Sequence, residues 1–289
     1  MELLAIITRM NLKKLVLVPI GMLLIASFIL ASNYRAGTIP MSIELKGGTL
    51  ITAYNVPNGG ELEAALEENF GIDFKFGTVN DLSGNEVGRT IETNVYLEGA
   101  VKDEITTFLV SRGVPEEEIA IKSVGPSLSA RFLREAVKAV LFAFLFMAAV
   151  VFIRFKALAP SLAVVLSAFS DIVTTIAVMI LLGIQLSPGS FVALLLLIGY
   201  SVDTDIVLAT RILVRKIGSF EERLEKAMKT GLTMTVTTLS AVVILLLVAT
   251  SEVLREIAVV LLIGLLVDLV NTWLQNARIL QWYAEKQGI

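Results

Sequence analysis

Four aspartates interrupt segments of this chain that are otherwise apolar. Asp203 and Asp205 stand two residues apart in one segment, and Asp171 and Asp268 stand in two others. Removing an ionised carboxylate from water is costly, so such residues usually serve ion or proton pathways. At about 100° per residue, helix positions two apart point to nearly opposite faces. Because of their cost in an apolar segment, we take all four aspartates as proton-relay candidates. Because of the spacing of Asp203 and Asp205, we expect one of these two to face a bundle interior and the other to face a second membrane subunit.

Other polar residues at helical spacing accompany these aspartates. They are Ser167, Thr174 and Thr175 beside Asp171; Thr230, Thr233, Thr235, Thr237 and Thr238 in a later segment; and Gly264, Asn271, Thr272 and Gln275 around Asp268. Polar faces of membrane helices usually face each other, which predicts a polar interior. Structural alternatives remain: threonines that bond to their own helix, Asp268 reaching the headgroup region, and an ion pair between Arg211 and one aspartate.

The composition indicates an integral membrane protein. The chain has 289 residues, 55 % of them hydrophobic, and a mean hydropathy of +0.79. Cysteine and histidine are absent, which excludes disulfides, Cys-His or Ser-His-Asp catalysis and histidine-ligated metal sites. A glycine pair at 47–48 lies inside a strand pattern and lacks a following Lys-Ser/Thr, so a bulge or a bend is favoured over a phosphate loop. We expect no enzyme activity, cofactor or metal.

Six apolar segments are long enough to span a membrane, and they cover residues 15–31, 136–153, 160–182, 190–209, 232–250 and 257–274. Lysine and arginine gather before the first, after the last and in alternate loops, which predicts a multi-pass protein of the cell membrane with both termini cytoplasmic. A cleaved signal peptide is the alternative for the first segment, but six spans favour an uncleaved anchor. The predicted division is 1–31, 32–135 and 136–289.

Residues 32–135 form the predicted extracytoplasmic domain, which lies between the first and second spans. Strands are expected at 42–54, 73–79, 89–97 and 118–124, and helices at 60–70 and 101–111. This β-α-β-β-α-β order is typical of a ferredoxin-like α+β domain. The predicted fold is therefore an α-helical membrane protein with six transmembrane helices and one such domain.

Several short motifs, in order along the chain, resemble the SecD/SecF family of protein-export membrane proteins, within the resistance-nodulation-division superfamily. They are Gly-Gly-Thr at 47–49, Val-Gly-Pro at 124–126, Ser-Asp-Ile-Val at 170–173, Gly-Tyr-Ser-Val-Asp-Thr-Asp at 199–205 and Thr-Met-Thr-Val-Thr-Thr at 233–238. The resemblance is to the archaeal SecF type. It implies an auxiliary subunit that acts with SecD and the Sec translocation channel to promote export of polypeptides, with use of the proton gradient. The expected partners are SecD, the channel, the exported polypeptide and membrane lipid, without nucleic acid.

The chain departs from the bacterial motifs of that family. The bacterial aspartate of the 199–205 motif falls on Thr204, and an arginine linked to proton transport falls on Thr230. The resemblance and the polar stripes together give the supporting residues Thr204, Arg211, Thr230, Thr233, Thr237 and Asn271. We expect a relay through Asp171 and Asp203 or Asp205, completed by groups from SecD. The alternatives are a small-molecule efflux permease, which would need twelve spans and two outer domains, and a structural scaffold whose aspartates make interhelical hydrogen bonds.

Overall fold

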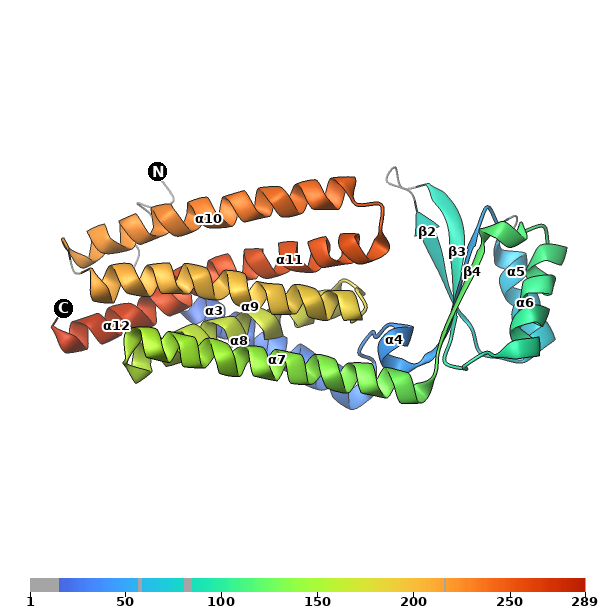
Figure 1. Cartoon of the computed structure of the whole chain (residues 1–289), viewed down its shortest axis with the longest axis horizontal. Coiled ribbons are helices and arrows are strands. Elements are labelled where there is room, and N and C mark those ends of the chain that lie inside the picture. Colours follow the sequence, from blue (N-terminus) through green and yellow to red (C-terminus); the bar gives the residue numbers. More distant parts are fainter. Residues whose placement is uncertain (1–15, 57–58, 81–84, 216, 289) are drawn as a thin grey trace. The chain divides into compact units, whose positions relative to one another are not determined.

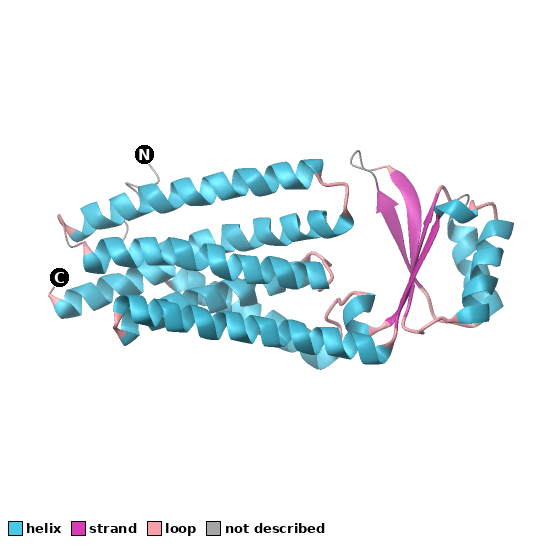
Figure 2. Ribbon diagram, viewed as in Figure 1, coloured by secondary structure: helices cyan, strands magenta, loops and turns pink. Residues whose placement is uncertain are grey.

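A computed structural model describes residues 16–56, 59–80, 85–215 and 217–288. The chain divides into two compact units: Met41–Glu135, and the residues up to Pro40 together with Ala136–Ile289. The second unit is helical and the first contains the sheet (Figures 1 and 2). Each unit has its own internal contacts and is described by itself.

Long helices make up the helical unit. They are α3 (Leu17–Ala36), α7 (Pro126–Phe155), α8 (Leu158–Leu181), α9 (Pro188–Ala209), α10 (Phe220–Val248), α11 (Glu252–Val270) and α12 (Ala277–Gln287). Among the described residues, five helices are long and apolar enough to cross a membrane: α3, α7, α8, α10, and α9 with its extension to Val214. The sixth predicted span falls on α11, whose 19 residues carry Glu252, Arg255, Glu256 and Asp268.

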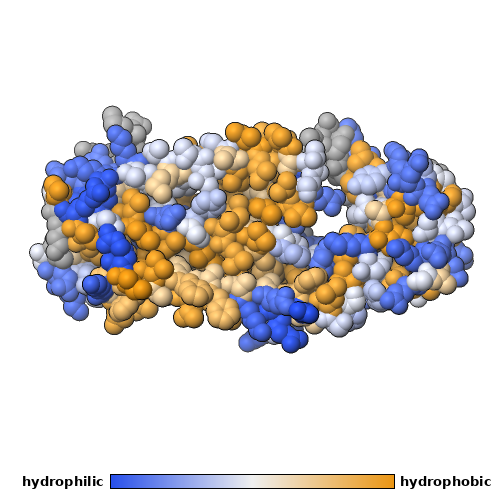
Figure 3. Space-filling model, viewed as in Figure 1, coloured by the Kyte–Doolittle hydropathy of each residue, from blue (hydrophilic) through white to orange (hydrophobic). Residues whose placement is uncertain are grey.

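The surface of the helical unit is apolar where a membrane would contact it. Leu141, Leu145 and Phe146 on α7 are each more than 60 % exposed, and apolar residues cover much of the helical unit in Figure 3. Helix α8 is enclosed instead: 61 % of its apolar window is buried, against 11 % for α3 and for α7. An apolar exposed surface around a buried helix is what a bundle solvated by lipid requires.

Two glycines allow close helix contacts around α11 and its extension. A Cβ at Gly264 would lie 2.4 Å from Leu197 Cδ2 of α9, and a Cβ at Gly231 of α10 would lie 2.5 Å from Cζ2 of Trp273. Small residues at such positions let membrane helices pack tightly. They therefore hold α9 and α10 close to the segment that carries Asp268 and Asn271.

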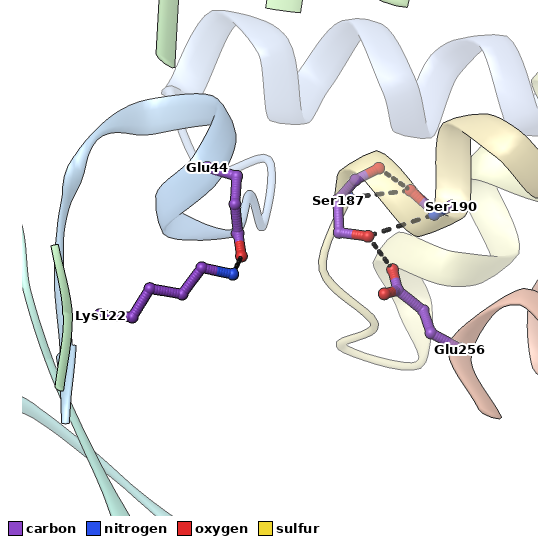
Figure 4. A network of polar contacts seen from close by, with 5 residues as sticks. All are labelled: Glu44, Lys122, Ser187, Ser190 and Glu256. Atoms are coloured by element: carbon purple, nitrogen blue, oxygen red, sulfur yellow. Dashed lines mark hydrogen bonds and ion pairs between the residues drawn. The ribbon is translucent and has the colours of Figure 1, made fainter. Parts of the chain in front are cut away.

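The N-terminal end of α9 is fixed by a capping box (Figure 4). The Ser187 hydroxyl accepts a hydrogen bond from the Ser190 backbone N–H at 3.1 Å, and the Ser187 N–H donates to Ser190 Oγ at 2.8 Å. Ser187 Oγ also donates to Glu256 Oε1 of α11. The cap satisfies backbone donors that the helix leaves free and ties α9 to α11.

The sheet-containing unit, Met41–Glu135, follows the order β1 (Gly48–Tyr54), α5 (Gly59–Phe70), β2 (Lys75–Asn80), β3 (Glu86–Thr93), α6 (Gly99–Ser111) and β4 (Ile119–Val124). The antiparallel sheet has the strand order β2-β3-β1-β4. Its core joins strand residues such as Ile51 and Ile91 to helix residues such as Leu66, Ile105 and Leu109. The period-2 and period-3.6 patterns of the sequence predicted this order of elements.

The first predicted strand, 42–54, is wrong in its first half. Ile43–Lys46 form a short helix, α4, and β1 begins at Gly48. Gly47 and Gly48 have φ values of 84° and 127°, which residues with a Cβ rarely adopt. A Cβ at Gly48 would also lie 2.2 Å from the Thr93 carbonyl oxygen. The glycine pair is thus the predicted bend.

Ion pairs connect α4 to the sheet. Lys122 of β4 pairs with Glu44 (Figure 4), and Lys46 pairs with Glu92 of β3. Partial burial raises the pKa of Glu44, but hydrogen bonds from Lys122 and Ser42 outweigh it and place the pKa below its usual range. The pairs therefore hold the bend against the sheet while these carboxylates are charged.

Candidate functional site

Carboxyl groups from three helices meet inside the helical unit. Asp171 of α8 and Asp205 of α9 are fully buried, and Asp268 of α11 is 1 % exposed. Asp171 Oδ2 accepts a hydrogen bond from Ser201 Oγ at 2.7 Å, and its Oδ1 accepts one from Asn271 Nδ2 at 2.7 Å. Asp171 thereby links α8 to α9 and to the continuation of α11.

Thr272 connects the other two carboxyl groups. Its hydroxyl lies 3.0 Å from Asp205 Oδ1 and 3.1 Å from Asp268 Oδ1, and Asn276 Nδ2 donates to Asp205 Oδ1 at 2.6 Å. A threonine hydroxyl has one hydrogen to donate. Both contacts of Thr272 can be separate hydrogen bonds only when one of the two carboxyl groups carries a proton and donates it to the threonine oxygen; otherwise the two carboxylates share the one hydroxyl hydrogen. The geometry therefore suits a proton shared between Asp205 and Asp268.

The network is rich in oxygen atoms and lacks a cation. In the part of the chain that the structure describes, no lysine or arginine forms an ion pair with Asp171, Asp205 or Asp268. Asp171 and Asp268 also interact electrostatically with each other. Within the described residues, two buried amide oxygens of the network have no hydrogen-bond partner, Asn271 Oδ1 and Asn276 Oδ1. Three charges held together in this setting would be costly, so the arrangement favours protons shared among the carboxyl groups.

A π-helical segment supplies many of the network's donors. Helix α11 continues as a π-helix over Asn271–Asn276, in which Asn271, Thr272, Gln275 and Asn276 are all buried. π turns are rare and are frequent at functional sites. A π turn closes between residues five apart, which brings Asn271 and Asn276 to the same side of the helix. Asn271 donates a hydrogen bond to Asp171, and Asn276 donates one to Asp205.

Asp203 lies apart from this network. It is exposed, whereas Asp205 is buried, so the two carboxyl groups occupy different faces of α9 as the helical spacing predicts. Asp203 borders an open hollow of about 230 Å³ between α9 and α10, which is lined by Tyr200, Asp203, Thr204, Met234, Thr235, Thr237, Thr238 and Leu265.

Some predicted site residues do not join the buried network. Thr230, Thr233 and Thr237 donate to carbonyl oxygens of their own helix. Thr233 and Thr237 are exposed and Thr230 is half-buried. Placing this stripe in the polar interior is therefore wrong, because α10 turns it outward and buries Thr235 instead. Thr204 is buried and bonds to the Tyr200 carbonyl oxygen at 3.4 Å.

Neither the headgroup position of Asp268 nor the ion pair of Arg211 is found in the described residues. Asp268 is buried within the bundle and does not reach outward to headgroups. Within the described residues, Arg211 makes no ion pair with an aspartate; it borders a separate hollow of about 180 Å³ with Arg215 and Thr230. Of the supporting residues, Asn271 is the one that contacts a candidate carboxyl group.

Sequence reasoning did not select Ser201 or Asn276 as site residues. Asp268, Thr272 and Asn276 follow one another at intervals of four, so one face of the predicted helix already contained Asn276. The prediction that this segment ends at 274 excluded it. The contact between Ser201 and Asp171 depends on how α8 packs on α9, which the spacing within one helix does not determine.

Comparison with known proteins places the chain among export proteins. Residues 105–286 match the family "Protein export membrane protein SecD/SecF, C-terminal". The chain is 39 % identical to "Protein-export membrane protein SecF" of Thermococcus gammatolerans, over 97 % of this chain and 88 % of that protein. It is 41 % identical to the protein of the same name from Methanocaldococcus jannaschii, over 92 % and 93 % of the two chains.

Solved structures show the same fold. The crystal structure of SecDF, a translocon-associated membrane protein from Thermus thermophilus, matches with a TM-score of 0.77 at 23 % identity; the match covers 96 % of this chain and 39 % of that chain. SecDF in its super-membrane-facing form gives a TM-score of 0.60 at 24 % identity, over 94 % and 38 % of the two chains. With the sequence relatives, these findings confirm the resemblance read from the motifs. The chain belongs to the SecD/SecF family of protein-export membrane proteins and, within it, to the SecF proteins.

Proposed function

We propose that this chain is an auxiliary membrane subunit of the Sec protein-export machinery that acts with a SecD-type partner and is not an enzyme. The names of its relatives and its family support this role. The chain spans 39 % of the SecDF chain that it resembles. Co-purification with a SecD-type protein and the Sec channel tests the assignment.

The finer architecture is part of this proposal. Six spans follow if α11 crosses the membrane with the five helices that meet the length and composition criteria. The strand order β2-β3-β1-β4 supports a ferredoxin-like outer domain. Both termini would be cytoplasmic, by the distribution of lysine and arginine. The outer domain would contact the exported polypeptide or the outer domain of the partner, while lipid surrounds the bundle.

The proton gradient would act on this subunit through the buried carboxyl network. The observation that supports it is the contact of the Thr272 hydroxyl with both Asp205 and Asp268, without a cation beside them in the described residues. A proton gained or lost there would change the hydrogen bonds between α9 and α11. Asp171 of α8 hydrogen-bonds to Ser201 and Asn271, so the contacts of α8 would change as well. Asp203 would serve the face toward the partner.

A structural scaffold is the second candidate, because each buried carboxyl group also makes hydrogen bonds. Variants Asp171→Asn, Asp205→Asn and Asp268→Asn separate the two, since an amide keeps the shape and can still hydrogen-bond but does not titrate. Export in membrane vesicles with and without a proton gradient is the assay. Coupling predicts that the gradient-dependent part of export is lost at normal protein level.

Asp103→Asn is the matched control, because Asp103 lies on α6 of the sheet-containing unit and is exposed. It should leave the response to the gradient unchanged. Full gradient-dependent export by all three network variants would remove the coupling proposal and leave the scaffold. Failure of the wild-type chain to co-purify with a SecD-type protein would remove the export assignment itself.

A further inference from the structure

Arginines gather where two helices of membrane length end. Helix α7 carries Arg154 in its last turn, and α9 continues through the π-helical segment Thr210–Val214, which carries Arg211. Arg154 Nη2 donates a hydrogen bond to Thr210 Oγ1 at 3.5 Å, so the two helices end beside each other (Figure 1). The span Pro188–Val214 has 27 residues, about 40 Å at 1.5 Å per residue, which is the thickness of a bilayer with its headgroup regions. These arginines therefore stand at the end of a helix that is long enough to reach the lipid headgroups.

An open hollow of about 180 Å³ lies beside these arginines, between α9 and α10. It is lined by Ile206, Val207, Thr210, Arg211, Arg215 and Thr230. Two guanidinium groups thus border the same space as two aliphatic side chains. The aliphatic residues come about one helical turn before the arginines on α9. We call this space the arginine hollow; it is cationic toward the end of the span and apolar toward its middle.

The arginines have no carboxylate partner in the part of the chain that the structure describes. No ion pair joins Arg154, Arg211 or Arg215 to an aspartate or a glutamate there. Arg211 is half-buried and Arg215 is exposed. The glutamates in the first turns of α10 are exposed as well, and they are Glu221, Glu222 and Glu225. The guanidinium donors of the arginine hollow are therefore open to an anion from outside the chain.

The mixed lining of the hollow selects the chemistry of that anion. Guanidinium groups bind phosphate through paired, charge-assisted hydrogen bonds. A free phosphate would use only the arginines, whereas Ile206 and Val207 suit the hydrocarbon next to a lipid headgroup. The volume is below the 300–1,000 Å³ that is typical of pockets for whole drug-sized ligands, so a headgroup can enter while its chains stay in the bilayer. A zwitterionic headgroup would bring a second cation toward the arginines, which favours an anionic one.

We propose that the arginine hollow binds the phosphate headgroup of an anionic membrane phospholipid. Arg211 and Arg215 contact the phosphate, Arg154 adds positive charge from its place beside Thr210, and the lipid chains follow α9 away from the arginines. Basic pockets between membrane helices bind anionic headgroups in this way. The inference requires a chain embedded in a membrane and does not depend on a role in export.

Lipid titration of the purified chain tests the site. The wild-type chain in detergent receives phosphatidylglycerol or phosphatidylcholine with the same acyl chains, and native mass spectrometry measures the Kd of the first bound lipid. We expect phosphatidylglycerol to bind more tightly. The double variant Arg211→Gln with Arg215→Gln should weaken its binding about 25-fold, about fivefold for each basic residue near an anionic headgroup, and should leave binding of phosphatidylcholine unchanged.

Lys156→Gln with Lys286→Gln is the matched control. It removes the same charge from two exposed residues that do not line the arginine hollow. Because salt screens exposed charges at a distance, phosphatidylglycerol should bind within about threefold of wild type. Arg215→Gln alone should weaken binding about fivefold. This single change at an exposed residue keeps the test available if the double variant does not fold, which its Tm reports.

The outcomes separate a lipid site from its alternatives. Equal binding of the two lipids by wild type, or an equal loss in the control pair, would show that no anionic headgroup is selected at the hollow. sn-Glycerol 3-phosphate carries the same phosphate without chains, so its competition at equal concentration would assign the hollow to free phosphate and overturn the lipid.

The partner subunit is the other possible source of negative charge. If the double variant binds phosphatidylglycerol as wild type does but loses affinity for a SecD-type protein, the arginines serve that protein and the lipid proposal fails. The lipid titrations use this chain alone, so a failure of the export assignment would appear only in co-purification and would leave their result unchanged.

Discussion

Thr272→Val removes the one hydroxyl that lies between two buried carboxyl groups and leaves the side-chain shape almost unchanged. Thr272 is fully buried, with Asp205 Oδ1 at 3.0 Å and Asp268 Oδ1 at 3.1 Å. After the change, Asp205 Oδ1 keeps its bond from Asn276, and Asp268 Oδ1 loses its contact with the hydroxyl. The substitution therefore isolates the hydroxyl bridge from α11 to α9.

The expected cost follows from the acceptors involved. Hydrogen bonds to charged groups contribute about 1.5–3 kcal/mol each, and a buried acceptor left without a donor costs a similar amount. One hydroxyl hydrogen is lost, so we expect the free energy of unfolding to fall by about 1.5–3 kcal/mol. For a chain of this size that corresponds to a fall in Tm of about 2–5 °C.

Thermal unfolding of the purified chain in detergent, followed by tryptophan fluorescence, measures this change. Trp273 is buried next to Thr272 in the same π-helical segment, so it reports on the network directly. Thr272→Ser restores the hydroxyl and should recover most of the loss. Asp268→Asn should keep or raise the Tm, because its amide can donate to the Thr272 oxygen and free the hydroxyl hydrogen for Asp205.

Thr237→Val is the matched control. The Thr237 hydroxyl donates only to carbonyl oxygens of its own helix and is exposed, so the same substitution there should change the free energy of unfolding by less than about 0.5 kcal/mol. Equal Tm values for Thr272→Val and Thr237→Val would refute the bridge. A fall in Tm for Asp268→Asn as large as that for Thr272→Val would refute proton sharing between the carboxyl groups.

Three further changes probe the elements that hold the site. Gly231→Ala should lower the Tm by an amount that corresponds to about 1–3 kcal/mol, because its Cβ would lie 2.5 Å from the buried, rigid ring of Trp273; an unchanged Tm would show that α10 does not pack as described. Ser187→Ala should cost about 1 kcal/mol through loss of the α9 cap and should raise amide hydrogen exchange at the first turn of α9, whereas unchanged exchange there would contradict the cap. Glu44 has a lowered pKa when folded, so its pair with Lys122 stabilises the sheet-containing unit fully at pH values above the ordinary carboxyl value of 4.5, and this stabilisation is lost as the pH falls through the lowered pKa of the folded state. Glu44→Gln should therefore increase hydrogen exchange in β1 at pH 7 and have a smaller effect at pH 3, and an equal effect at both pH values would contradict the assignment.

The sequence alone predicted a mostly helical chain with several apolar, membrane-length helices, and it predicted the order of elements in the sheet-containing unit. These follow from local patterns: apolar runs of membrane length, period-2 and period-3.6 alternation, and turn residues. Helical spacing also separated Asp203 from Asp205, since that angle is a property of one helix. Several short motifs in order along the chain, taken together, indicated the family. The short helix α4 was missed because strand and helix patterns are ambiguous over four residues.

Tertiary structure decided which aspartates act together. Asp171 and Asn271 are 100 residues apart, and their contact depends on how α8 packs against the continuation of α11. The spacing of α9 could not say which aspartate of the pair faces inward; contact with Thr272 and Asn276 places Asp205 there. A local pattern fixes the faces of a helix, whereas the neighbour that each face meets depends on packing between segments far apart in the chain. That packing buries Asp205 in the network and leaves Asp203 on the open side of α9.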